Sequence, residues 1–177
     1  GTGVAVSVSF AAAGMGSDTC GSIRIPAANQ NLVGLRPTRG LSSRSGVMPL
    51  SDLQDVAGPL ARTVTDLALM LDATVGPDPD DAVTADAAAH VPPSYRDGLG
   101  TAQLKGARIG VLTALFGGAP EDEPVATLTR KALDAMKAEG AEIVEVTVPG
   151  LDDLLRDSSV IADEFKFDFA AYLARHP

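Results

Sequence analysis

A strand, helix, strand order in residues 107–148 constrains the fold of this chain more than any other feature. The first segment, ARIGVL, has the apolar character of a strand, and the last, AEIVEVTV, is typical of a second strand. Between them, EDEPVATLTRKALDAMKAEG has the acidic, proline-containing start and the glycine beyond its end that are typical of a helix. Two strands joined in this way run parallel, with a right-handed crossover, in nearly all proteins. The order therefore predicts an α/β fold.

Composition agrees with this fold class and argues against one class of partner. A chain of 177 residues can bury roughly 70% of its unfolded surface, and its 45% hydrophobic and 4% aromatic residues suit helices packed closely on strands. The formal net charge is −9 and Lys and Arg are not clustered, whereas binding a phosphate backbone needs several cations on one face. We therefore expect no nucleic-acid partner.

The cysteine count and the apolar runs bear on location. Cys20 is the only cysteine, so the chain forms no internal disulfide and no multi-thiolate metal site, and a cytoplasmic location is expected. No run of about 18 apolar residues occurs, and GTGVAVSVSF at the start lacks the basic region of a signal peptide. We expect a soluble chain with no membrane partner. Because it does not begin with Met, we also expect it to be part of a longer protein.

The first half of the chain is predicted to hold short elements around a glycine-rich corner. Residues 3–18 are expected to form a short helix that leads into a buried strand, with the corner at residues 14–21. The segment LVGLRPT is predicted to be a buried strand that ends at Pro37. In residues 63–76, apolar side chains recur at helical spacing and Gly76 supplies a C-terminal stop. The apolar positions of this predicted helix are Val64, Leu67, Ala68 and Leu71.

Two later segments complete the outline. Residues 77–105 are rich in Pro and Asp, and we interpret them as a surface excursion. Residues 151–177 are predicted to be mostly helical, with Phe165, Phe169 and Leu173 on one stripe.

The segment GSDTCGSIRIPA, residues 16–27, is the strongest candidate for chemistry. Its glycines permit a sharp turn, and successive N–H groups from Thr19 to Ser22 would converge ahead of a helix N-terminus. A serine hydroxyl at the edge of such a cup could attack a carbonyl whose oxyanion those amides stabilise. The alternative is that Ser22 is only the N-cap of the following helix, since Ser is a favoured N-cap residue.

A nucleophilic serine needs a neighbouring base, and the two histidines are poorly placed to provide one. His90 lies in the Pro-rich excursion and His176 is next to the end of the chain. We therefore interpret both as solvated residues and not as members of a Ser-His-Asp triad.

The strings GSDTCGSIRIPAANQNLVGLRPTRG and GPLARTVTDLALML resemble the signature region of the amidase signature family. The resemblance is strongest over residues 1–76, and DEFKFDFAAYL near the end is similar to members related to bacterial peptide amidases. It implies that residues 1–177 are the central segment of a single domain. In that family a large, mixed, twisted β-sheet is covered by helices.

The resemblance also implies the roles of individual residues. Ser22 would be the nucleophile, and the amides of Thr19, Cys20, Gly21 and Ser22 itself would form the oxyanion hole. The family's two other triad members, a serine beside a cis peptide bond and a lysine, would precede residue 1. The lysines of this chain do not match that motif and are interpreted as solvated charges: Lys105, Lys131, Lys137 and Lys166.

Other residues near the motif are interpreted as structural. Cys20 stands where the family more often has glycine, and we expect a buried, inert thiol there. Asp18 and Arg24 are expected to form an ion pair that fixes the loop. Asp55 and Arg62 match family positions outside the triad, and we expect them to support the structure.

The functional hypothesis is hydrolysis of a carboxylic amide through an acyl-enzyme on Ser22, with a small-molecule or peptide amide as substrate. No cofactor and no metal are needed. GTGVAV lacks the remaining features of a dinucleotide fingerprint, and PDPDD, residues 77–81, lacks the spacing of an EF-hand. Two alternatives stay open: an amide-hydrolysing subunit of an amidotransferase, and a catalytically incomplete scaffold. A homodimer is also left open.

Overall fold

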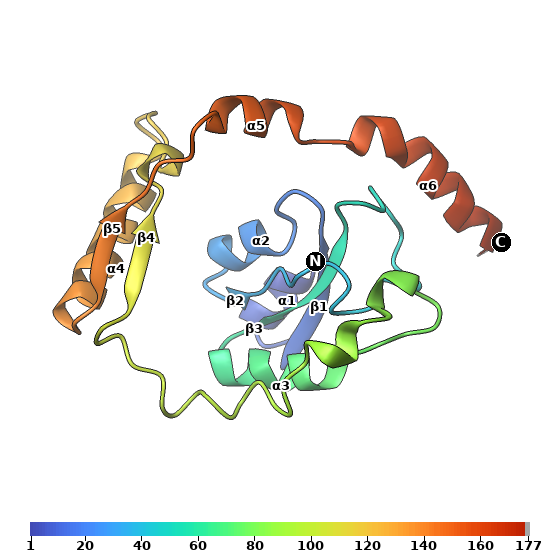
Figure 1. Ribbon diagram of the computed structural model, residues 1–177, viewed down its shortest axis with the longest axis horizontal. Helices are drawn as coiled ribbons and strands as arrows, with labels where there is room; N and C mark the ends of the chain where they lie inside the picture. The colour runs from blue at the N-terminus through green and yellow to red at the C-terminus, as the bar shows by residue number, and fades with distance from the viewer. Residues whose placement is uncertain (176–177) are drawn as a thin grey trace. The chain divides into compact units, whose positions relative to one another are not determined.

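The structure is a computed structural model, and it describes residues 1–175. It contains two units, residues 1–99 together with the segment from Ser159 onward, and residues 100–158 (Figure 1). The elements, in chain order, are α1 (Thr2–Ser7), β1 (Ala13–Asp18), α2 (Arg24–Asn29), β2 (Val33–Gly34), β3 (Val56–Ala61), α3 (Val64–Thr74), the 3-10 turns η1 (Ala82–Thr84) and η2 (Ala87–Ala89), β4 (Arg108–Val111), the 3-10 turn η3 (Thr113–Leu115), α4 (Glu123–Ala138), β5 (Glu142–Glu145), α5 (Leu151–Asp157) and α6 (Ile161–Arg175). The predicted α/β class is confirmed.

A three-stranded antiparallel sheet forms the centre of the first unit, in the order β1-β3-β2. All 6 residues of β3 are buried, and β1 pairs with it along its full length, from Ala13 opposite Ala61 to Asp18 opposite Val56. The sequence did not predict β3. The predicted strand LVGLRPT is wrong in extent, since only Val33 and Gly34 form β2. Pro59 has no N–H with which to continue the ladder beyond them.

The glycines before the candidate motif lie in a strand, so the predicted corner at residues 14–21 begins too early. Gly14 and Gly16 belong to β1, where a Cβ on Gly14 would lie 2.5 Å from Thr2 Cγ2 and one on Gly16 would lie 3.1 Å from Leu60 Cδ1. Glycine is needed there for close packing of α1 and β3 on the strand. The expected order of short helix and then strand is confirmed by α1 and β1.

Helix α3 follows β3 directly and covers the sheet, as its spacing predicts (Figure 1). The Thr63 side chain caps its N-terminus by accepting a hydrogen bond from the Asp66 N–H at 3.0 Å. Leu67 and Leu71 pack against Ala61 of β3 in a buried cluster. Val64, the first residue of the helix, is exposed and does not join that cluster.

The excursion after α3 is not uniformly at the surface. Asp81, Thr84 and Ala87 are buried, and the Asp81 carboxylate binds Arg44 in the loop that precedes β3.

The second unit contains the predicted strand, helix, strand order. Strands β4 and β5 are parallel, in register from Arg108 opposite Glu142 to Val111 opposite Glu145, and α4 lies between them in the chain.

Helix α6, which belongs to the first unit, carries the expected aromatic stripe, with the Phe165 and Phe169 rings stacked at 5.5 Å. Residues 176 and 177, including His176, lie outside the described residues. Within residues 1–175, no helix combines the length and apolar character needed to cross a bilayer.

Candidate active site

Ser22 lies in the turn between β1 and α2 and is exposed. Ile23 anchors the turn to the core, since its side chain is fully buried against Ala27 and Leu60. Helix α2 begins at Arg24, its N-cap residue is Ile23, and the side chain of that residue makes no capping hydrogen bond. The alternative interpretation of Ser22 as the N-cap is therefore wrong.

The carboxylate of Asp18 organises this turn. Asp18 is the last residue of β1, is fully buried, and accepts hydrogen bonds from the N–H groups of Gly21 at 2.8 Å, Ile23 at 3.1 Å and Arg24 at 3.3 Å. The N–H groups of Ile23 and Arg24 lie at the start of α2, where a helix leaves its N–H groups without intrahelical partners. The turn from residue 19 to residue 24 thus wraps around one buried carboxylate.

Two arginines compensate the charge of Asp18. Arg24 donates from Nε and Nη2, each at 3.1 Å, and Arg36 Nε lies 3.4 Å from Asp18 Oδ1. Burial by itself would raise the pKa of Asp18. The hydrogen bonds from the Arg24 guanidinium and from the N–H groups of the turn stabilise the charged form more strongly, so its pKa is lowered from 3.8 to about 2. The predicted ion pair between Asp18 and Arg24 is confirmed.

Position 21 requires a glycine. Its φ is +141°, which side chains rarely adopt, and a Cβ would lie 2.6 Å from Ile25 Cδ1. Its N–H already donates to Asp18, so Gly21 could contribute to an oxyanion hole only by sharing that N–H between two acceptors. Within residues 1–175, the N–H groups of Thr19, Cys20 and Ser22 donate no hydrogen bond.

Cys20 is exposed, so the expectation of a buried thiol is wrong. The residues on either side of it, Thr19 and Gly21, are both buried. The turn therefore directs Cys20 outward while its neighbours pack inward.

A contact that the sequence interpretation missed joins the turn to the start of β3. The hydroxyl of Thr19 donates to Asp55 Oδ1, and the other carboxylate oxygen accepts from the N–H groups of Leu50 at 2.8 Å and Ser51 at 3.1 Å. Thr19 and Asp55 are 8% and 5% exposed, so the contact is shielded from water. Arg62, by contrast, donates to the carbonyl oxygens of Val6 in α1 and of Ala11 after it, which is the structural support expected of it.

The other basic residues lie apart from this turn. His90 is exposed at the end of η2 and lines a separate cavity with Arg39 and Tyr95. The four lysines are all exposed, as expected: Lys105, Lys131, Lys137 and Lys166. Within the part of the chain that the structure describes, no three His, Cys, Asp or Glu side chains are arranged to hold a metal ion.

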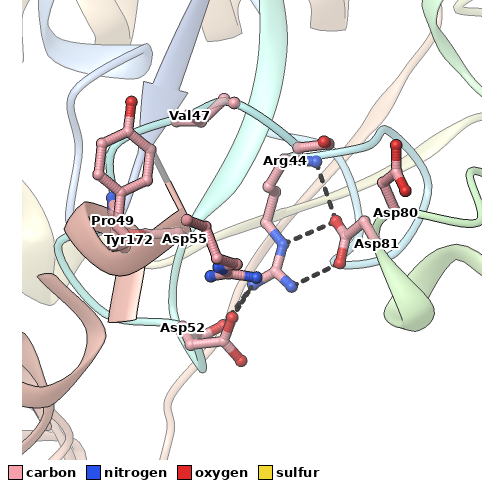
Figure 2. Close-up of a pocket in the computed structure, with 11 residues that line it drawn as sticks. Arg44, Val47, Pro49, Asp52, Asp55, Asp80, Asp81 and Tyr172 are labelled. Carbon is pink, nitrogen blue, oxygen red and sulfur yellow. Dashed lines mark hydrogen bonds and ion pairs between the residues drawn. The ribbon is translucent and has the colours of Figure 1, made fainter. Parts of the chain in front are cut away.

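A cavity of about 310 Å³ lies beside the loop of residues 44–55, next to the end of α6 (Figure 2). Arg44 projects into it and forms a two-point ion pair with Asp81, at 3.0 and 2.8 Å, and a further contact with Asp52 at 3.1 Å. The hydrogen bond from Arg44 lowers the pKa of Asp81. Arg44 is therefore held by carboxylates on two sides of this cavity, and Ser22 is not part of its lining.

Comparisons with known proteins place this geometry in a family context. A family profile described as Amidase matches residues 1–176. A glutamyl-tRNA(Gln) amidotransferase subunit of Halorhodospira halophila is 41% identical over 162 residues, which are 92% of this chain and 32% of that protein. A protein named probable amidase from Arabidopsis thaliana is 36% identical over 177 residues, or 98% of this chain and 33% of that protein.

A solved structure is similar over nearly the whole chain. The native peptide amidase of Stenotrophomonas maltophilia superposes with a TM-score of 0.82 at 34% identity, covering 99% of this chain and 36% of that chain. This chain thus spans about a third of the length of the proteins it matches.

Proposed function

The chain belongs to the amidase family, and on that premise we propose that the protein containing it hydrolyses a carboxylic amide with Ser22 as the nucleophile. The observation that carries the proposal is the position of Ser22, exposed on a turn that is held rigidly by a buried, charge-compensated carboxylate. A nucleophile held in one place reacts faster because the entropy of orientation is already lost.

In the proposed reaction, Ser22 Oγ attacks the carbonyl carbon of the amide while its hydroxyl proton passes to the base, and a tetrahedral intermediate forms. The C–N bond then breaks, the nitrogen takes up a proton from that base and leaves as ammonia or an amine, and an ester remains on Ser22. Water hydrolyses the ester, releases a carboxylic acid and restores the hydroxyl. Because the lysines of this chain lie on other elements, we assign the base, together with the family's second serine, to the protein outside residues 1–177.

The oxyanion of the intermediate would be stabilised by the backbone of the turn. We assign this role to the N–H groups of Thr19, Cys20, Gly21 and Ser22, with Gly21 limited by its bond to Asp18. A carboxylate beneath an oxyanion would oppose catalysis if it were alone, but Arg24 and Arg36 offset the charge of Asp18. The turn can therefore be fixed by an anion without repelling the one that forms in the reaction.

A second candidate function is that of the amide-hydrolysing subunit of an amidotransferase, which passes ammonia to a partner protein. The similarity to the amidotransferase subunit of Halorhodospira halophila favours it. In both cases the substrate is an amide and no cofactor is required. The cytoplasmic location and a homodimer stay predictions.

Ammonia release by the full-length protein tests the proposal. The substrates are a peptide with a C-terminal amide and glutamine, and Ser22→Ala is compared with Ser17→Ala, a matched change on neighbouring β1. We expect Ser22→Ala alone to abolish hydrolysis. Turnover of the peptide amide by the isolated protein supports an amidase, and turnover of glutamine only with a partner supports the amidotransferase. Full activity of Ser22→Ala would overturn both.

A further inference from the structure

Two buried carboxylates hold the Ser22 turn, one at each end. Asp18 binds its second half, through the N–H groups of Gly21, Ile23 and Arg24. Asp55 binds its first half, through the hydroxyl of Thr19. The proposed function accounts for the first contact only as support for the nucleophile, and it leaves the second without a role.

The position of Asp55 follows from the sheet. Strands β1 and β3 pair up to Asp18 opposite Val56, so the next residues in the same register are Thr19 and Asp55. This register places the Thr19 hydroxyl against the carboxylate just where the chain leaves the sheet to form the turn. The contact therefore lies at the point of the chain from which the N–H groups of the turn follow.

Asp55 is itself held firmly in place. The oxygen that does not contact Thr19 accepts from the N–H groups of Leu50 at 2.8 Å and Ser51 at 3.1 Å. The Ser51 side chain is fully buried and donates to Glu164 Oε2 of α6 at 2.5 Å. Two backbone donors fix the orientation of the carboxylate, so its free oxygen presents one defined acceptor to Thr19.

We propose that Asp55 is a positioning residue for the oxyanion hole, acting through the hydroxyl of Thr19 and not through contact with the substrate. This inference rests on the proposed function of the turn. Its physical basis is that the hydroxyl contact aims the N–H groups of Thr19 and Cys20 at the oxyanion. Oxyanion donors act on the transition state far more than on the bound substrate, so poor aim lowers kcat and leaves KM nearly unchanged.

The test uses the full-length protein and an amide substrate that it turns over. Thr19→Val keeps the shape of the side chain and removes the hydroxyl, whereas Thr19→Ser keeps the hydroxyl. We expect Thr19→Val to lower kcat by about 10- to 100-fold, the range expected for displaced donors, with KM within about twofold of the original protein. We expect Thr19→Ser to retain kcat within about threefold.

Asp55→Asn provides a second variant and a coupling measurement. Its amide oxygen can keep the bonds from the N–H groups of Leu50 and Ser51, which turns the NH₂ group toward Thr19. The Thr19 hydroxyl then faces a donor where it now has an acceptor, so kcat should fall without a matching rise in KM. Because the two side chains act through one contact, Thr19→Val combined with Asp55→Asn should be no slower than the slower single variant within about threefold. Asp55→Asn also serves alone if Thr19→Val fails to fold, as judged by circular dichroism.

The outcomes separate this inference from the proposed function. If Ser22→Ala keeps full activity, the proposed function fails and this inference with it. If Ser22→Ala is inactive while Thr19→Val matches the original kcat, only the positioning role is overturned. It is also overturned if Thr19→Val and Thr19→Ser lose activity equally, or if the loss is confined to KM.

Discussion

Asp18→Asn should open the Ser22 turn, and the size of the effect follows from the contacts of the carboxylate. The substitution keeps the shape of the side chain but removes the charge that pairs with Arg24 and Arg36. It also turns an NH₂ group toward N–H donors of the turn. Removing one partner of a buried ion pair typically costs 3–5 kcal/mol, and Arg24 is 55% exposed and can regain water, so we expect about 3 kcal/mol.

The same carboxylate predicts a pH dependence. The pKa of Asp18 is lowered to about 2 from 3.8, so its contribution is complete well above pH 3.8 and is lost as the pH falls toward 2. At 1.36 kcal/mol per pKa unit, the turn should lose about 2 kcal/mol of its opening free energy between pH 5 and pH 2. In Asp18→Asn this loss should be absent.

Hydrogen exchange of the peptide that spans residues 19–25, corrected for intrinsic rates, measures the opening directly. At pH 7, protection of the turn should be roughly 100-fold lower in Asp18→Asn than in the original protein. In the original protein itself, protection should fall by roughly 30-fold from pH 5 to pH 2, since each 1.36 kcal/mol is tenfold. The matched control is Asp72→Asn, which also removes a carboxylate that binds an arginine, Arg96, on the surface. Exchange within twofold of the original protein in Asp18→Asn, or no pH dependence, would refute the reasoning.

Three further predictions concern other contacts. Arg44→Lys keeps the charge but loses the two-point pair with Asp81, whose side chain is 8% exposed, and should lower the unfolding free energy by about 1.5–3 kcal/mol in denaturant titrations. Glu164→Ala leaves a buried hydroxyl and an N–H of the turn at 51–53 without their acceptor, so it should cost about 1–3 kcal/mol and speed proteolysis near α6. Gly21→Ala should lower the melting temperature and kcat together, because φ +141° is a backbone conformation that residues with a side chain rarely adopt.

The elements that the sequence predicted well are those with local signals. Helix α3 has its capping Thr63 and its buried Leu67 and Leu71 within one segment, and α4 has an acidic start and a glycine stop. The short helix and strand before the motif were also recognisable. In each case the information lies within a few turns of the chain.

Strand β3 was missed because its local signal is misleading. Gly58 and Pro59 are both unfavourable in strands, yet β3 is the buried centre of its sheet. Pro59 is tolerated because β2 is only 2 residues long, so its pairing with β3 needs no hydrogen bond donated from position 59. The glycines of β1 misled in the same way, since they signal close packing here and not a turn.

The contacts around Ser22 could be predicted only in part. Asp18 and Arg24 are six residues apart and their pairing was expected, but Arg36 and Asp55 reach the turn through the sheet. Thr19 and Asp55 are 36 residues apart, and only the register between β1 and β3 brings them together. Because that strand was missed, no signal in the sequence alone pointed to the contact. The exposure of Cys20 also depends on the direction of the turn.

Reaction of the full-length protein with a fluorophosphonate tests most directly whether Ser22 is the nucleophile. Such a reagent phosphonylates an activated serine, and peptide mass mapping locates the adduct. We predict one adduct, on the peptide that contains Ser22, which disappears in Ser22→Ala and persists in Ser17→Ala. An adduct of undiminished yield in Ser22→Ala, or one located on a different residue, would contradict the assignment of Ser22.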